Sequence, residues 1–155
     1  MSKIEKRLAE LGIELPEAPK PAAVYVPAKK FGDKFLYISG QDCRKDGVLI
    51  YEGKVGSDLT IEQGYEASRQ AMINTLAVVK SVIGDLDKIK DFVKLLGFVN
   101  SAEGFVEQPY VINGASELLE EIFGERGRHA RSALSANELP FNTPVEIETI
   151  LELEE

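Results

Sequence analysis

The sequence contains one cysteine, one histidine and no tryptophan among its 155 residues. With Cys43 as the only cysteine no internal disulfide can form, which is typical of the reducing cytoplasm, and we predict a cytoplasmic protein. A single histidine and a single cysteine cannot build a zinc site, and no spacing of acidic residues matches a calcium loop. Phosphate-binding loops and nucleophile-elbow motifs are also missing. We therefore expect neither a metal nor a cofactor.

Long apolar runs and a surplus of basic residues are absent as well. No run approaches the roughly 18–20 apolar residues that a membrane-spanning helix needs, and the N-terminal segment lacks the apolar core of an export signal. The formal net charge is −8, which argues against a general nucleic-acid partner because phosphate neutralisation needs surplus Lys and Arg on one face. Hydrophobic residues at 44% and charged residues at 28% are typical of a soluble globular protein.

The organisation of the chain favours one domain over residues 1–155, because no internal repeat, linker or low-complexity segment interrupts it. We divide it into an N-terminal extension at 1–21 and a core at 22–153. The extension is predicted to begin with a short helix at 3–11, ended by Gly12, and to continue as a proline-rich extended segment.

The first third of the core has the pattern of antiparallel strands. Two β-rich runs, AAVYV at 22–26 and FLYISGQ at 35–41, are separated by a predicted turn around Gly32-Asp33. Asp46-Gly47 predicts a tight hairpin turn because both residue types accept positive φ angles.

The period then changes to that of helices. Residues 57–84 carry one apolar stripe at helical spacing, with a capping-box pattern at Thr60 and a terminating Gly84. A buried strand is predicted at 91–99, and a second amphipathic helix ends at Gly124. The predicted fold class is therefore α+β: one mostly antiparallel sheet with two helices packed on one face.

The last strand predicts that both faces of the sheet carry apolar residues. Residues 145, 147, 151 and 153 are apolar and share one face, which should contact the helices. The opposite face combines Glu146, Glu148 and Glu152 with Ile150. A face too apolar for water and too polar for a core indicates a subunit interface, so we expect a homo-oligomer.

Residues 126–131 place three arginines and the only histidine within one short segment of an acidic chain. If the following run is extended, Arg131 shares a face with Ala133 and Ser135, which leaves room for a bidentate grip on a carboxylate or phosphate. The alternative is a surface ion pair between Arg131 and one of the many glutamates. We interpret His129 as a loop or interface residue rather than a catalyst, since no orienting partner is evident.

Cys43 also has two interpretations. Its neighbours Arg44 and Lys45 would lower the pKa of the thiol and make it reactive. We favour an ordinary thiol beside a turn, because the sequence shows no cysteine–histidine pair.

Several motifs carry a resemblance to a known family. The segment HARSALSANELPFNTPVEIETI has an Arg-Ser pair at the start of a strand, followed by Leu-Pro and then by an EIE-type strand. An earlier segment, YVPAKKFGDKFLYISGQ, has a tyrosine and a strand that ends in Ser-Gly-Gln. Together with the helix–strand–helix order between them, these segments resemble the RidA/YjgF family, also called the L-PSP endoribonuclease family. The resemblance covers about residues 22–153.

The resemblance implies a chorismate-mutase-like fold of the bacillus type, assembled as a homotrimer with inward-facing sheets and three intersubunit sites. It also implies a small carboxylate-bearing substrate and hydrolytic deamination of reactive enamine or imine intermediates, such as 2-aminoacrylate, to a 2-keto acid and ammonia. In this reading Arg131 holds the substrate carboxylate and Glu146 orients or deprotonates the attacking water. The substrate-binding residues carried over are Arg131, Gly40 through its N–H, Tyr25 as a pocket wall, Ser39 and Asn113.

The sequence departs from the family pattern at two places, and these departures suggest alternative functions. Ala133 stands where the family often has a thiol, and the stretch 102–118 is longer than the usual connection. A second hypothesis is therefore a non-catalytic trimer that binds small carboxylates as a sensor or carrier. The ribonuclease activity in the family's older name is the least favoured, because of the acidic charge balance.

Overall fold

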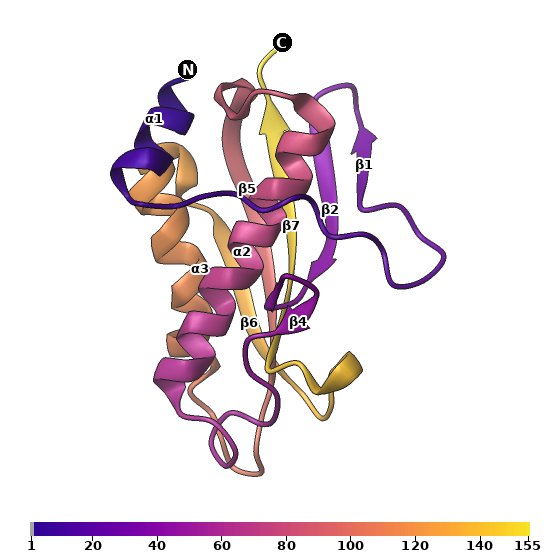
Figure 1. Cartoon of the computed structure of the whole chain (residues 1–155), viewed down its shortest axis with the longest axis vertical. Coiled ribbons are helices and arrows are strands. Elements are labelled where there is room, and N and C mark those ends of the chain that lie inside the picture. The colour runs from indigo at the N-terminus through magenta and orange to yellow at the C-terminus, as the bar shows by residue number, and fades with distance from the viewer. Residues whose placement is uncertain (1) are drawn as a thin grey trace.

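Five strands form one sheet, and helices α2 and α3 cover one of its faces (Figure 1). The computed structural model describes residues 2–155. Its elements are α1 (Lys3–Glu10), β1 (Ala28–Phe31), β2 (Phe35–Gln41), β3 (Arg44–Lys45), β4 (Val48–Leu49), α2 (Ile61–Ile83), β5 (Ile89–Asn100), α3 (Gln108–Phe123), β6 (Ala130–Ala136) and β7 (Val145–Leu153). Short 3-10 turns lie at Leu86–Lys88, Gly124–Gly127 and Pro140–Asn142.

The strand order is β1-β2-β7-β5-β6, and β3 and β4 form a separate hairpin. Every pairing in the large sheet is antiparallel except that of β5 with β6, which α3 connects. The predicted α+β class with a mostly antiparallel sheet is confirmed. The hairpin at Asp46-Gly47 is confirmed too, with φ angles of 54° and 80°.

Helix α2 begins where its capping box predicts. Thr60 Oγ1 accepts a hydrogen bond from the N–H of Gln63 (3.1 Å), and Gln63 Oε1 accepts one from the N–H of Thr60 (2.9 Å). These contacts satisfy donors that a helix start leaves free. Gly84 ends the helix with a φ of 80°.

The contact between α2 and α3 depends on a glycine. A Cβ at Gly114 would lie 2.1 Å from the carbonyl oxygen of Tyr65, so only glycine permits this approach of the two helices. The packing fixes the position of α3, and with it the side chains that α3 presents to the sheet edge.

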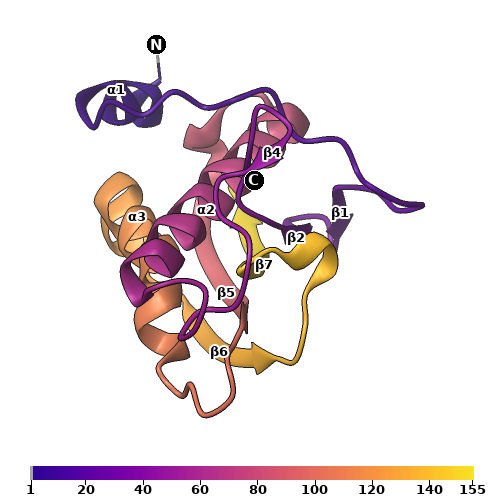
Figure 2. The ribbon, with the colours of Figure 1, turned by 60° about the horizontal axis from the view of Figure 1, so that its bottom comes forward.

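The N-terminal segment packs against the rest of the chain. Ile4 and Leu8 are buried in the core, and the Asp87 carboxylate accepts hydrogen bonds from the N–H groups of Lys3 and Ile4, both at 2.9 Å. After α1 the chain crosses α2 and reaches β1 at the far edge of the sheet (Figures 1 and 2).

The strand predicted at 22–26 is wrong, because the first strand lies at Ala28–Phe31 and residues 22–26 are exposed, with bends at 22–25. Pro21 and Pro27 flank the segment and have no N–H to give to a ladder. The pairing with β2 starts only after Pro27, with Ala28 opposite Ile38.

The register of β7 confirms the predicted separation of its two faces. Val145, Ile147, Leu151 and Leu153 are buried toward the helices. The face that the helices leave uncovered carries the glutamates and also large apolar side chains from all five strands, namely Phe31, Phe35, Tyr37, Leu96, Phe98, Leu134 and Ile150. Several of these are markedly exposed: Leu134, for example, is 48% exposed.

Candidate functional site

Arg131 lies on the edge strand β6 and points toward α3. It is aligned with the buried Leu95 of β5, on the helix-covered side of the sheet. Its Nη1 donates to Asn113 Oδ1 (2.9 Å) and to Ser116 Oγ (3.1 Å), and Nη2 donates to the carbonyl of Pro109 (3.3 Å). All three acceptors are neutral groups of α3, so they orient the guanidinium without neutralising its charge.

The predicted alternative, an ion pair between Arg131 and a glutamate, is wrong. Within residues 2–155, no carboxylate lies within ion-pair distance of Arg131. Burial lowers the pKa of Arg131, but a guanidinium stays charged in proteins.

The other arginines of the basic segment have structural partners. Arg126 Nη1 donates to the carbonyl of Ile89 (2.9 Å). Arg128 pairs with Glu120 at 3.8 Å and with Glu125 at 3.5 Å. The charge of Arg126 also acts on the nearby Asp87 carboxylate, so within residues 2–155 Arg131 is the arginine of this segment that has no carboxylate beside it.

His129 is part of the same hydrogen-bond network, although the sequence suggested only a loop or interface residue. Its Nδ1 lies 2.8 Å from the Gly127 carbonyl, which can only accept, and its Nε2 lies 2.9 Å from Ser116 Oγ. Burial lowers the pKa of His129, and the charge of Arg131 lowers it further, which favours the neutral ring. Arg131, Asn113, Ser116 and His129 are called the arginine cluster below.

Ser116 is the member of this cluster that sequence reasoning missed. The available signal was its position three residues after Asn113, which places both side chains on one face of α3.

Glu146 lies on the uncovered face of the sheet, aligned with Phe98 of β5. A Cβ at Gly40 would lie 2.7 Å from Glu146 Oε1, so the glycine makes space for this carboxylate. The part of the chain that the structure describes offers Glu146 no hydrogen-bond donor and no cation. Burial raises the pKa of Glu146, and the nearby charges of Asp42 and Glu148 raise it further.

Ser39 and Tyr25 lie beside Gly40. Ser39 Oγ donates to the Val26 carbonyl (2.7 Å), which ties β2 to the segment before β1. Tyr25 and Gly40 line one small cavity of about 50 Å³ together with Asp42 and residues 19–22. Glu146, Gly40, Ser39 and Tyr25 are called the glutamate cluster below.

A single chain does not bring the two clusters together. Arg131 is on the helix side of β6, whereas Glu146 is on the uncovered side of β7, and β5 lies between these strands. The two strand spacings from β6 to β7 alone separate the clusters by roughly 9–10 Å.

Cys43 is an ordinary buried thiol. Its Sγ lies 3.6 Å from the Tyr51 carbonyl and 3.7 Å from Thr143 Oγ1. Burial raises its pKa, so the interpretation as a thiol activated by its basic neighbours is wrong.

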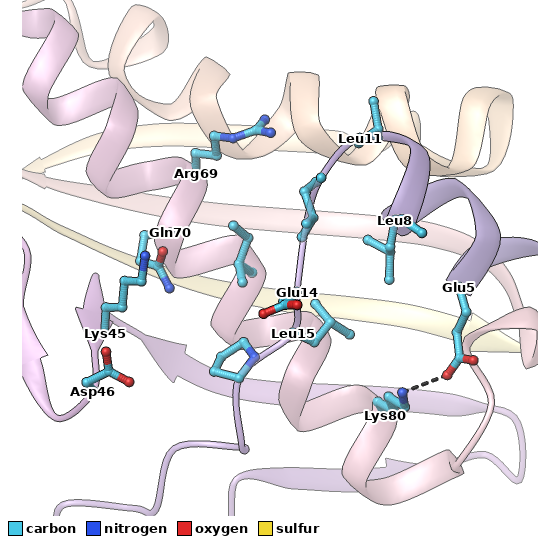
Figure 3. Close-up of a pocket in the computed structure, with 15 residues that line it drawn as sticks. Glu5, Leu8, Leu11, Glu14, Leu15, Lys45, Asp46, Arg69, Gln70 and Lys80 are labelled. Carbon is cyan, nitrogen blue, oxygen red and sulfur yellow. Dashed lines mark hydrogen bonds and ion pairs between the residues drawn. The ribbon is translucent and has the colours of Figure 1, made fainter.

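A larger groove of about 1150 Å³ lies elsewhere, between the N-terminal segment and α2 (Figure 3). Leu8, Leu11 and Leu15 line it, and the Glu5–Lys80 ion pair (2.6 Å) lies at one side. No residue of either cluster lines this groove. Across residues 2–155 no three His, Cys, Asp or Glu side chains are grouped to hold a metal ion, and no helix has the length and apolar character to cross a membrane.

The sheet order and the helices on one face define the class of the protein as a chorismate-mutase-like α+β fold. A family model described as "YjgF/chorismate_mutase-like, putative endoribonuclease" matches residues 5–153, and the chain belongs to this family.

Relatives match along nearly the whole chain. Protein TCP17 of Trypanosoma cruzi is 41% identical over 97% of this chain and 94% of its own length. The crystal structure of Atu1372 from Agrobacterium tumefaciens is 46% identical with a TM-score of 0.91, covering 98% of this chain and 93% of that one. A Shewanella oneidensis protein described as a "putative endoribonuclease" is 38% identical with a TM-score of 0.94, covering 98% and 100%.

Proposed function

We propose that the protein hydrolyses small imino or enamino acids of the 2-aminoacrylate type to a 2-keto acid and ammonia. The observation that carries this proposal is that one chain presents both groups: an Arg131 that neutral side chains fix and no carboxylate neutralises, and a Glu146 that has no hydrogen-bond partner and a raised pKa. The arginine suits a carboxylate, and the glutamate, with its raised pKa, suits proton transfer.

Arg131 is the anchor of the substrate. Its guanidinium is held by Asn113 and Ser116, so less side-chain freedom is lost when an anion binds. Charge-assisted hydrogen bonds to a carboxylate contribute on the order of 1.5–3 kcal/mol.

Glu146 is the base and then the acid. Its carboxylate takes a proton from water as the water oxygen bonds to the imine carbon, while the imine nitrogen is protonated from solvent. Collapse of the resulting carbinolamine forms the C=O bond and breaks the C–N bond; Glu146 returns its proton to the leaving ammonia, and the hydroxyl proton of the carbinolamine passes to solvent. An enamino acid reaches the imine first by tautomerisation, in which its β-carbon gains a proton and its nitrogen loses one. Gly40 lies against Glu146, and Tyr25 lines a small cavity with Gly40; in this proposal the N–H of Gly40 and the ring of Tyr25 border the substrate.

The two clusters meet between subunits of a homotrimer in this proposal. The uncovered face, with its exposed apolar side chains and Glu148 and Glu152, forms the interior or rim of the assembly. Sedimentation should show a trimer at micromolar concentration, and a stable monomer would contradict both the assembly and the intersubunit site.

Two alternatives lead to different outcomes. A sensor or carrier would keep carboxylate binding at Arg131 but show no turnover. A ribonuclease would bind RNA tightly and lose that binding when Arg126 and Arg128 are neutralised, which we do not expect because both arginines already have partners in the chain.

The direct experiment is turnover of freshly generated 2-aminoacrylate. Keto-acid release is followed with and without the protein, in a cytoplasm-like reducing buffer. Acceleration over the spontaneous reaction supports the proposal, and its absence alongside measurable pyruvate binding supports the carrier.

A further inference from the structure

Ser116, which helps to hold the Arg131 guanidinium, also contacts His129, a residue that the hydrolysis described above does not use. The three residues form a continuous chain of hydrogen bonds. Arg131 Nη1 donates to Ser116 Oγ (3.1 Å), Ser116 Oγ lies 2.9 Å from His129 Nε2, and His129 Nδ1 lies 2.8 Å from the Gly127 carbonyl. The carbonyl requires that Nδ1 carry hydrogen. In the neutral ring Nε2 is then an acceptor, so the Ser116 hydroxyl must donate to it.

The hydroxyl has only one hydrogen, and the neutral ring uses it. Ser116 can therefore accept from Arg131 but cannot donate to a ligand beside it. When His129 is protonated, Nε2–H donates to Ser116 Oγ. The hydroxyl hydrogen stays on Ser116 but no longer bonds to the ring. It can then turn toward an anion held by Arg131, while the bond from Nδ1 to Gly127 is unchanged.

The charges around His129 make its protonation sensitive to such an anion. The positive charge of Arg131 on β6 disfavours protonation of His129, whereas the negative charge of Glu120 on α3 favours it. Glu120 is shared with Arg128, which also pairs with Glu125. Lys94 of β5 donates to Ser132, on the opposite face of the sheet. An anion bound to Arg131 therefore offsets the main positive charge that acts on the ring.

We infer that Ser116 and His129 are positioning residues for Arg131, and that they couple binding of a small carboxylate to uptake of one proton by His129. This inference rests on the proposed role of Arg131 as a carboxylate anchor. By linkage, a ligand that favours the protonated ring binds more tightly as the pH falls.

The sole histidine permits a direct spectroscopic test, because every imidazole signal of the protein belongs to His129. In protein labelled with 15N-histidine, the nitrogen shifts at pH 7.5 should show the Nδ1–H tautomer. Saturation with pyruvate, a stable 2-keto acid, should move the titration midpoint of the ring to higher pH. Calorimetry at pH 5.5 in two buffers of different ionisation enthalpy should show net proton uptake on binding.

Variants separate the contributions of His129 and Ser116 to pyruvate binding. Wild-type protein should bind pyruvate roughly threefold to tenfold more tightly at pH 5.5 than at pH 7.5. His129→Gln keeps an acceptor near Ser116 but cannot titrate, so its affinities for pyruvate at pH 5.5 and at pH 7.5 should be equal, whatever its affinity at pH 7.5. Ser116→Ala should lose affinity at both pH values, because Arg131 loses an acceptor, and should lose more at pH 5.5, where the hydroxyl hydrogen can turn toward the anion. Ser81→Ala, whose hydroxyl contacts only the Val78 carbonyl of its own helix, is the matched control.

The outcomes distinguish this inference from the function on which it rests. An Nε2–H tautomer, or pyruvate binding with no proton uptake, would overturn the coupling and leave the carboxylate site standing. A pH-dependent gain that persists in His129→Gln would also overturn it. If wild-type protein binds no pyruvate at either pH, the anchor role of Arg131 fails, and the coupling fails with it.

Discussion

The arginine cluster and the glutamate cluster are satisfied to very different degrees within one chain. Arg131 has three hydrogen-bond acceptors from a helix that close packing at Gly114 holds in place. Glu146 is half-buried without a donor, beside Asp42 and Glu148, which repel its charge. The first arrangement is preorganised for an anion, and the second stores an electrostatic cost that a substrate, a water or a neighbouring subunit can relieve.

The largest expected effect is on the glutamate cluster. Glu146→Gln keeps the shape of the side chain but removes the base, so kcat for imine hydrolysis should fall by about 10²–10⁴ while KM changes little. Glu152→Gln is the matched control, since it lies on the same face of β7 but is held by Lys34 and Lys90. Wild-type kcat in Glu146→Gln would mean that another group activates the water.

The arginine cluster should respond through substrate binding. Arg131→Ala should lower kcat/KM by roughly 10- to 100-fold, the loss expected for a charge-assisted contact, with the fold intact. Arg131→Lys should rescue poorly because an ammonium lacks the planar fork. The control is Arg128→Ala, which removes an arginine paired with glutamates. Steady-state kinetics that leave Arg131→Ala like wild type would remove the anchor role.

Gly40→Ala tests whether the position of the Glu146 carboxylate matters. The new Cβ would displace the mobile end of Glu146 rather than backbone, so stability should change little. The activity should nevertheless fall, by about tenfold to a hundredfold, because small misplacements of a catalytic group are costly. Thermal unfolding and kcat measured on the same sample separate the two effects. A drop in stability that matches the drop in activity would contradict this account.

The smallest expected effect is on stability. The pKa of Glu146 is raised above its ordinary 4.5, so the folded state disfavours the ionised carboxylate. The destabilisation is absent below the ordinary value, grows between the ordinary and the raised value, and is complete above the raised one. Glu146→Gln should therefore stabilise the protein at pH 7 by about 0.5–1 kcal/mol, a small gain because solvent still reaches the side chain and screens its charge. The gain should vanish near pH 4, as denaturant unfolding at both pH values would show.

Regular periodicity explains which parts of the fold could be predicted from the sequence. The capping box at Thr60 and the alternation along β7 are local patterns, and both match the structure. The first strand was misplaced because the apolar run at 22–26 looks like a strand, whereas its pairing depends on where β2 offers a partner.

In the candidate site too, local sequence patterns predict some features, and contacts between distant segments decide the others. Arg131 and Glu146 could be assigned from motif positions that resemble a family. The contact of Ser116 with His129 could not, because nothing in the local sequence tells which distant side chain a helical serine meets. The separation of the clusters on opposite faces also depends on strand order, which no single segment encodes.

The most direct test of a site completed between subunits is complementation of two inactive variants. Arg131→Ala keeps Glu146, and Glu146→Gln keeps Arg131. If each site takes its arginine from one subunit and its glutamate from the next, equal amounts unfolded together and refolded should regain about a quarter of wild-type activity, because about one interface in four then joins two intact residues. Each variant refolded alone is the control. A mixture no more active than the variants alone would contradict the intersubunit site.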